Sequence, residues 1–105
     1  MLSGRTLLAP EAKKLGLIDR VTKREELLSI AIEYAKSMGD NPQISLKHIK
    51  NLLTINGNET DLELIQKREQ AALKECYETE EHKEAISSFI EKREPDFKAA
   101  RSMKK

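Results

Sequence analysis

The stretch from Thr79 to Phe97 reads TEEHKEAISSFIEKREPDF and predicts the most clearly bounded helix of the chain. The Thr79 hydroxyl can cap the helix start, and two glutamates follow in the first turn, where the helix dipole favours negative charge. Pro95 ends the helix, because the residue before a proline avoids helical backbone. One apolar stripe lies between these limits, made of Ala85, Ile86, Phe89 and Ile90.

Lys92 belongs to the last turn of this predicted helix, where cations are favoured. It follows Phe89 by three residues, so we expect its side chain to project from the edge of the apolar stripe. An ammonium in that place suits an anion docked beside a hydrophobic surface. The alternative is an ordinary solvated surface lysine.

Length and composition favour one soluble-type helical domain. The chain has 105 residues, with 38% apolar and only 4% aromatic side chains, which suits amphipathic helices better than a β-sandwich. Its 19 basic and 18 acidic residues leave a net charge of +1, so we expect neither nucleic acid nor an anionic membrane as a partner. The one cysteine, Cys76, fits the cytoplasm or another reducing compartment.

Periodicity and capping signals predict an all-α fold of about four longer helices plus a short N-terminal one. Two T-x-x-E capping boxes mark helix starts, at Thr22 and at Thr60, and Asn41 can cap a helix that has Pro42 at its first position. The expected elements before the last helix are a short helix from Pro10 to Leu15 closed by Gly16, a weak strand from Leu17 to Val21, and longer helices from Thr22 to Gly39, Asn41 to Asn56, and Thr60 to Cys76.

The residues from Lys98 to Lys105 are expected to form a flexible basic tail. Four cations lie in it: Lys98, Arg101, Lys104 and Lys105. We interpret it first as a frayed terminus. The alternative is an arm that attracts phosphate groups.

No catalytic or metal-binding constellation is visible in the sequence. His48 and His82 have no carboxylate or cysteine at a spacing that would complete a metal site. Cys76 follows the apolar positions of its helix and is expected to be a small buried hydrophobe. Nearly all carboxylates lie on polar helix faces beside Lys or Arg, where nothing raises their pKa for general acid work. The chain taken by itself therefore lacks the groups of an active site.

Two segments in this order resemble the end of an enoyl-CoA hydratase/isomerase, a member of the crotonase superfamily. The segment from Leu2 to Val21 is similar to the family passage "LTGR, xAEEA, GLVDxV". The segment from Glu84 to Phe97, with FIEKR and PDF, matches the family ending "FxEKRxPxF". The order and separation of these segments extend the likeness over essentially all 105 residues.

The resemblance implies that residues 1–105 are a single C-terminal helical domain without the spiral β-β-α core of the crotonase fold. In such enzymes the spiral supplies two backbone amides that hold the thioester oxygen, and also the acidic residues that move protons. Surface side chains cannot replace amides fixed in place before charge develops. We therefore expect no turnover by this chain alone and no required cofactor. The chain would be an excised piece, a short isoform, or a gene that kept only its last part.

The resemblance also implies a ligand and a partner. In the family these helices cover the active-site end of the spiral and build a trimer interface, so self-association is expected. Lys92 matches the lysine that reaches the phosphate-bearing end of coenzyme A in several hydratases. Leu73 falls at the adenine-side position, where some members place an aromatic ring, so stacking would be lost here. An acyl-CoA thioester would be the ligand of the parent enzyme.

Two other functions stay open at this level. One is a free-standing helical module that binds a partner protein through its apolar stripes and has no acyl-CoA ligand. The other is nucleic-acid binding through the basic residues from Lys98 onward, which would be sensitive to salt. The choice among hydration, isomerisation and related chemistry, and the preferred acyl chain, would be set by the upstream part of such an enzyme.

Overall fold

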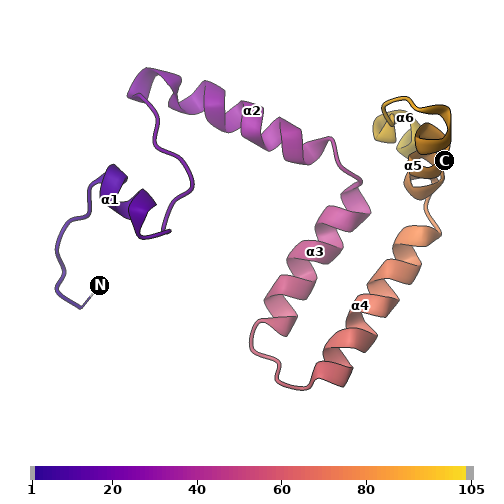
Figure 1. Cartoon of the computed structure of the whole chain (residues 1–105), viewed down its shortest axis with the longest axis horizontal. Coiled ribbons are helices and arrows are strands. Elements are labelled where there is room, and N and C mark those ends of the chain that lie inside the picture. The colour runs from indigo at the N-terminus through magenta and orange to yellow at the C-terminus, as the bar shows by residue number, and fades with distance from the viewer. Residues whose placement is uncertain (1, 104–105) are drawn as a thin grey trace. The chain divides into compact units, whose positions relative to one another are not determined.

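The computed structural model describes residues 2–103, and every regular element in that range is helical (Figure 1). The all-α class and the four longer helices are thereby confirmed. No strand forms at Leu17 to Val21, which is turn and coil, since no neighbouring strand is present to pair with it. The helices are α1 (Ala9–Lys14), α2 (Leu27–Gly39), α3 (Gln43–Asn56), α4 (Leu62–Tyr77), α5 (Glu80–Glu91) and α6 (Phe97–Ser102), with a 3-10 turn at Arg24–Glu26 before α2.

The chain groups into two compact units, Met1–Ala35 and Lys36–Lys105. The first holds α1 and the 3-10 turn, and the second holds the helices from α3 to α6. The single domain expected from the length stays a prediction.

In the first unit, the predicted start and end of α1 at Pro10 and Gly16 are confirmed. Pro10 lies in its first turn, where the missing amide hydrogen costs nothing. Gly16 has a φ of 78°, and the amide of Leu17 donates to the carbonyl of Ala12 at 3.0 Å, so the glycine closes the helix in a left-handed turn. Nearby, the Arg20 guanidinium lies 5.1 Å from the ring centre of Tyr34.

The capping box predicted at Thr22 is wrong. The 3-10 turn intervenes before α2, its flanking residue is Lys23, and no side chain caps it. The tighter turn moves the first free amides away from Thr22, so its hydroxyl is one residue too early to reach them.

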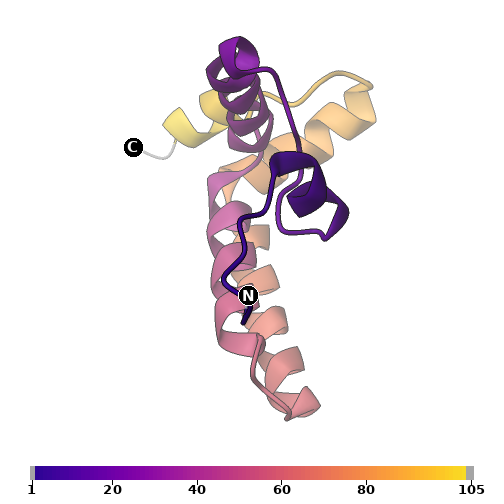
Figure 2. The same cartoon turned by 90° about the vertical axis from the view of Figure 1, so that its left-hand side faces the viewer.

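In the second unit, α3 and α4 form an antiparallel hairpin, and both views show them side by side (Figures 1 and 2). The predicted break after Asn56 is confirmed. Arg68 closes this loop, since its Nη1 donates to the Asn56 Oδ1 at 3.0 Å and lies 3.5 Å from the Glu59 Oε2. Beyond the hairpin, α5 packs against α4 and α6 packs against α5.

Two of the predicted caps in this unit are displaced by one residue. Asp61, not Thr60, caps α4, because its carboxylate accepts from the amides of Glu63 at 3.0 Å and Leu64 at 3.2 Å. At α3 the flanking residue is Pro42 and the first helical residue is Gln43. The cap predicted at Thr79 is confirmed, since its hydroxyl accepts from an amide of α5.

Asn41 serves the helix before it. Its side-chain amide donates to the carbonyl of Met38 at 3.2 Å, near the end of α2, and therefore is not the cap of α3. An amide side chain can satisfy either end of a helix, and here the orphan carbonyls are closer.

The basic tail predicted from Lys98 begins inside a helix. Asp96 caps α6 by accepting from the Ala99 amide at 2.9 Å, and Ala100 is buried. This capped and packed helix differs from the frayed terminus that the sequence predicts for 98–102. Lys104 and Lys105 lie outside the described residues.

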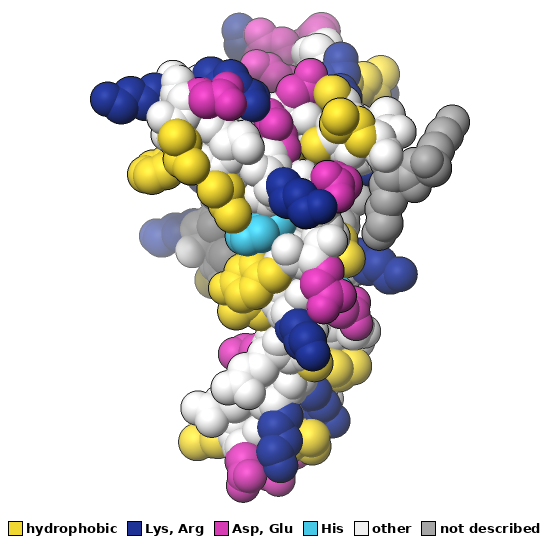
Figure 3. Space-filling view, turned by 90° about the vertical axis from the view of Figure 1, so that its right-hand side faces the viewer, with side chains coloured by type: hydrophobic (Ala, Val, Ile, Leu, Met, Phe, Trp, Pro, Cys, Tyr) yellow, Lys and Arg dark blue, Asp and Glu magenta, His cyan; other side chains and the backbone are white. Residues whose placement is uncertain are grey.

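Very little apolar surface is buried. Among the described residues the buried apolar side chains are Ala72 and Ala100. The accessible surface is 9337 Å², whereas a folded monomer of 12.0 kDa exposes roughly 6,000 Å². Apolar side chains lie open between charged ones on the face drawn in Figure 3. These helices therefore present apolar faces that nothing in the described chain covers.

Candidate functional site

Lys92 ends α5 in a left-handed backbone conformation. Its φ is 55° and its ψ is 44°, and it is the one non-glycine residue with positive φ among residues 2–103. Its amide donates to the Phe89 carbonyl at 3.3 Å, and the Arg93 amide donates to the Ser88 carbonyl at 3.0 Å. This pair of bonds closes the helix as a terminal glycine commonly does. The prediction that Lys92 lies in the last helical turn is therefore wrong: the residue lies just beyond the helix.

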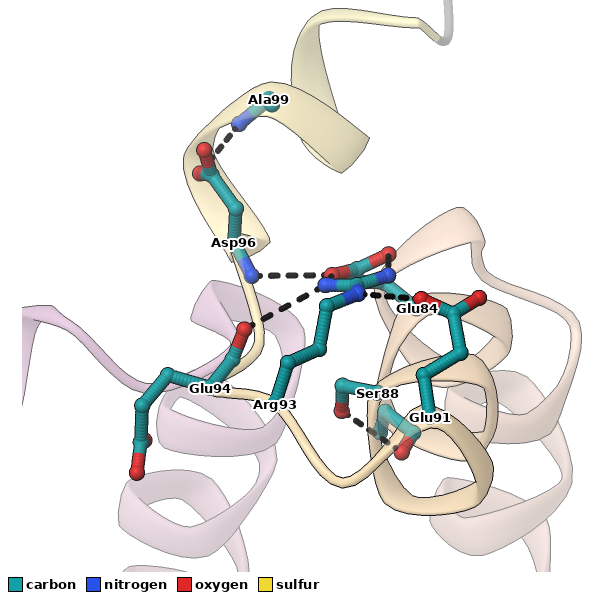
Figure 4. Close-up of polar contacts among 8 residues, drawn as sticks. Glu84, Ser88, Glu91, Arg93, Glu94, Asp96 and Ala99 are labelled. Atoms are coloured by element: carbon teal, nitrogen blue, oxygen red, sulfur yellow. Dashed lines mark hydrogen bonds and ion pairs between the residues drawn. The ribbon is translucent and has the colours of Figure 1, made fainter.

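Four residues around this turn form what we call the Arg93 clamp: Glu84, Glu91, Arg93 and Asp96 (Figure 4). The Arg93 guanidinium binds both carboxylate oxygens of Glu84, through Nη1 to Oε1 and through Nη2 to Oε2 at 3.1 Å. Its Nε donates to the Glu91 Oε2 at 2.6 Å. The Glu84 Oε1 also accepts from the Asp96 amide at 3.0 Å. One carboxylate thus ties α5 to the loop that leads into α6.

The Glu84–Arg93 pair of the clamp is ionised over most of the pH range. The hydrogen bond from Arg93 and, next, that from the Asp96 amide lower the pKa of Glu84 to about 2, against the smaller opposing effect of desolvation. The same carboxylate, followed by Glu91, raises the pKa of Arg93. Because two carboxylates bind the guanidinium, the charge of Arg93 is balanced within the chain. Its neighbour Lys92 forms no ion pair with the carboxylates of residues 2–103, so it is the cation of this turn that an external anion can reach.

Glu81 is a buried carboxylate that sequence reasoning missed. Its residue is 6% exposed, although the carboxylates were expected on polar faces. Its Oε2 accepts from the Gln43 amide at 3.2 Å and lies 3.5 Å from the Arg101 Nη2. Glu81 of α5 therefore caps α3, which has no side-chain cap of its own, and also holds α6.

Leu73, the adenine-side position by resemblance, is exposed on α4. It lines a cavity of about 320 Å³ together with Ile49 and Leu52 of α3 and Tyr77 of α4. Lys92 does not line this cavity, so the structure does not bring the two predicted site residues into one pocket. Tyr77 supplies an aromatic ring one helical turn after Leu73. The spacing of four residues between them is the sequence feature that could have indicated Tyr77 as a second residue of this cavity.

The histidines and the cysteine have partners that the sequence did not reveal. His48 lies 2.9 Å from the Glu75 carboxylate across the hairpin, and the Ser45 hydroxyl donates to the Cys76 sulfur at 3.8 Å. The His82 ring is 4.8 Å from the Tyr77 ring. Cys76 is half-buried, whereas the sequence predicted a buried residue. In residues 2–103 no three histidine, cysteine or acidic side chains are grouped as metal ligands.

None of the helices within residues 2–103 has both the length and the apolar content needed to cross a membrane.

The family model for enoyl-CoA hydratase/isomerase matches residues 1–100. The chain belongs to this family. The resemblance to the crotonase superfamily, drawn from the terminal segments, is thereby confirmed.

Individual relatives agree with this assignment. The chain is 31% identical over 93 residues to a short-chain-enoyl-CoA hydratase of Clostridium acetobutylicum, an alignment that covers 89% of this chain and 35% of the relative. It is 33% identical over 96 residues to the putative enoyl-CoA hydratase/isomerase YngF of Bacillus subtilis, covering 91% and 36%. A crystal structure of an enoyl-CoA hydratase from Geobacillus kaustophilus HTA426 superposes with a TM-score of 0.81 at 30% identity, covering 92% of this chain and 36% of that one.

The chain thus spans about a third of the length of these curated relatives. Its all-helical structure agrees with the predicted C-terminal helical region of a crotonase fold.

Proposed function

We propose that this chain is the helical region of an enoyl-CoA hydratase/isomerase-like enzyme acting on acyl-CoA thioesters, and that it serves subunit association and covers coenzyme A. The supporting observation is the open apolar surface of the helices, combined with membership of the family. The chemistry of the whole enzyme would be addition of water to an enoyl thioester or a related step, a lyase-type reaction of fatty acid metabolism. We assign no catalytic step to the described residues.

The association role rests on the apolar faces. Phe89 is 85% exposed and Ile90 is 72% exposed on α5, and Leu53 and Leu62 are similarly open on the hairpin helices. Soluble monomers rarely expose apolar side chains at such density, and surfaces of this kind mark interfaces. Another protein body, either the rest of an enzyme or a second copy of this chain, would cover them.

The coenzyme A role rests on Lys92. Coenzyme A carries several phosphate groups, and the Lys92 ammonium is unpaired within residues 2–103 while Arg93 beside it is occupied by two carboxylates. A compact ammonium on a flexible stem can pair with a phosphate as a point charge. In this proposal the cavity lined by Leu73 and Tyr77 receives the adenine ring, and Tyr77 supplies the aromatic ring that is absent at position 73.

The test is a titration of the full chain with coenzyme A, followed by NMR, on the wild type and on Lys92→Gly. Glycine removes the ammonium and suits the left-handed backbone, so a loss of binding cannot be attributed to disruption of the turn. We expect shifts centred on Lys92 and about fivefold weaker binding by the variant, the effect of one exposed charge pair.

Lys83→Ala is the matched control, because Lys83 is on the same helix but its ammonium is paired with Glu80 at 2.5 Å. It should bind coenzyme A as the wild type does. An unchanged spectrum at millimolar coenzyme A would contradict the ligand role and favour a helical module that binds only protein.

A further inference from the structure

The backbone of Lys92 is held in a conformation that its side chain disfavours. A left-handed residue with a Cβ is crowded against the following carbonyl, and glycine avoids this crowding. Such conformations persist only where the surrounding structure determines them, and they gather at ligand-binding positions. The question for this turn is therefore which groups hold Lys92 there.

The Arg93 clamp links the residues on both sides of Lys92. Glu91 precedes it and Arg93 follows it, and their side chains are joined at 2.6 Å. The same guanidinium is anchored to Glu84, nine residues back on α5. The Glu84 side chain is only 18% exposed, and it also fixes the Asp96 amide on the far side of the turn. The chain is thus pinned immediately before, immediately after and four residues beyond Lys92.

We propose that Glu84 and Arg93 are positioning residues that hold the Lys92 backbone in its left-handed conformation and so direct its ammonium to a phosphate group of coenzyme A. The identity of that ligand rests on the function proposed above, whereas the hold on the backbone does not. Arg93 is given no ligand contact in this proposal, because two carboxylates balance its charge and its Nε, Nη1 and Nη2 each donate to Glu84, Glu91 or the Glu94 carbonyl. Neither residue contacts the phosphate, and both act through Lys92.

The decisive variant is Glu84→Gln, studied in the full chain. It removes the charge that Arg93 binds and keeps the size of the side chain. We expect the NMR coupling and chemical shifts of Lys92 to move away from left-handed values. We also expect coenzyme A to bind about fivefold more weakly, as in Lys92→Gly, although the ammonium is still present.

Two further variants separate positioning from general damage. Glu63→Gln breaks an ordinary exposed ion pair, Glu63 with Lys67 at 3.3 Å on α4, and should change neither the Lys92 conformation nor binding. Arg93→Lys keeps the charge but cannot bridge two carboxylates as a guanidinium does, so both readouts should lie between wild type and Glu84→Gln. If Glu84→Gln does not fold, the Lys92 conformation and coenzyme A binding of Arg93→Lys test the positioning role in its place, and wild-type values for both would overturn it.

The outcomes separate the two proposals. If Glu84→Gln leaves the Lys92 backbone left-handed and coenzyme A bound as in wild type, the positioning role is overturned. If Lys92→Gly binds coenzyme A as the wild type does, the ligand role of Lys92 fails. In that case the clamp is judged by the Lys92 backbone readout alone, where loss of the left-handed conformation in Glu84→Gln supports it and retention rejects it.

Discussion

Glu84 gives the chain a pH dependence that can be measured without any ligand. Its pKa is lowered from 4.5 to about 2 by Arg93 and the Asp96 amide, so the folded state favours the ionised carboxylate. The resulting stability is fully present above the unfolded pKa and is lost as the pH falls through the folded one. The window is therefore from about pH 4.5 down to about 2.

We expect the difference in thermal stability between wild type and Glu84→Gln to be largest above pH 5 and to shrink steadily toward pH 2. Circular dichroism melts at pH 6, 4, 3 and 2 would measure it. A difference that stays constant across this range would mean that Glu84 carries no charge-dependent stability. Glu63→Gln, on an exposed helical pair, should show no such pH trend.

For single residues, the resemblance predicts Lys92 and Leu73 as site residues, which stays a prediction, and the residues that contact the turn at Lys92 could not be predicted. Arg93 and Glu84 are nine positions apart, whereas side chains that pair along a helix are three or four positions apart. The left-handed turn at Lys92 lies between these two residues, and Arg93 directly after it reaches back to Glu84 on α5. The turn itself was hidden, because lysine gives no signal for a conformation that glycine usually takes.

At the scale of elements, helix caps offer the clearest test. We expect Asp61→Ala to destabilise the second unit by about 1 kcal/mol, because the free amides of Glu63 and Leu64 lose their acceptor. Thr60→Ala should change the free energy of unfolding by less than half of that, since Thr60 is outside the cap. Urea denaturation of both variants measures the two values. Equal losses would restore the capping box that the sequence predicted.

The helices themselves were predictable, and several of their ends were not. Apolar periodicity located α2 to α5, and Gly16 and Thr79 gave correct boundaries. Pro95 did not, because α5 already ends at Glu91 through the left-handed turn at Lys92. Caps failed where two candidate side chains were adjacent, as at Thr60 and Asp61, since sequence spacing cannot weigh a hydroxyl against a carboxylate. Helix α6 was not predicted because the cations from Lys98 onward indicated a flexible tail, although Asp96 directly after Pro95 is a strong cap.

One connection between elements had no sequence signal at all. Glu81 lies in the first turn of α5, where an acidic residue is already explained by the helix dipole. In the structure it also caps α3 and contacts α6 through Arg101. The position of Glu81 in the first turn already explains an acidic residue there, so the sequence gives no sign of its contacts with α3 and α6.

At the scale of the whole molecule, the open apolar faces predict self-association. We expect light scattering to show a mean mass that rises with concentration and with added sulfate, which strengthens apolar contact. Phe89→Ser should lower that mass, because Phe89 is the most exposed large apolar side chain of α5. Lys83→Gln on the same helix should not. A monomeric wild type at high concentration would count against the association role.

The closure of the α3–α4 hairpin has a consequence for synthesis. Its links, from Arg68 at the loop to Glu75 and Cys76 near the open end, join residues fairly close in sequence, and such local topologies fold in microseconds to milliseconds. A ribosome adds roughly 5–20 residues per second, so roughly one to five seconds separate the synthesis of Tyr77 from that of Ser102. The hairpin would thus fold much faster than the rest of the chain is made, and once both of its helices have left the ribosome a nascent-chain chaperone would meet a formed helical pair with bare leucines.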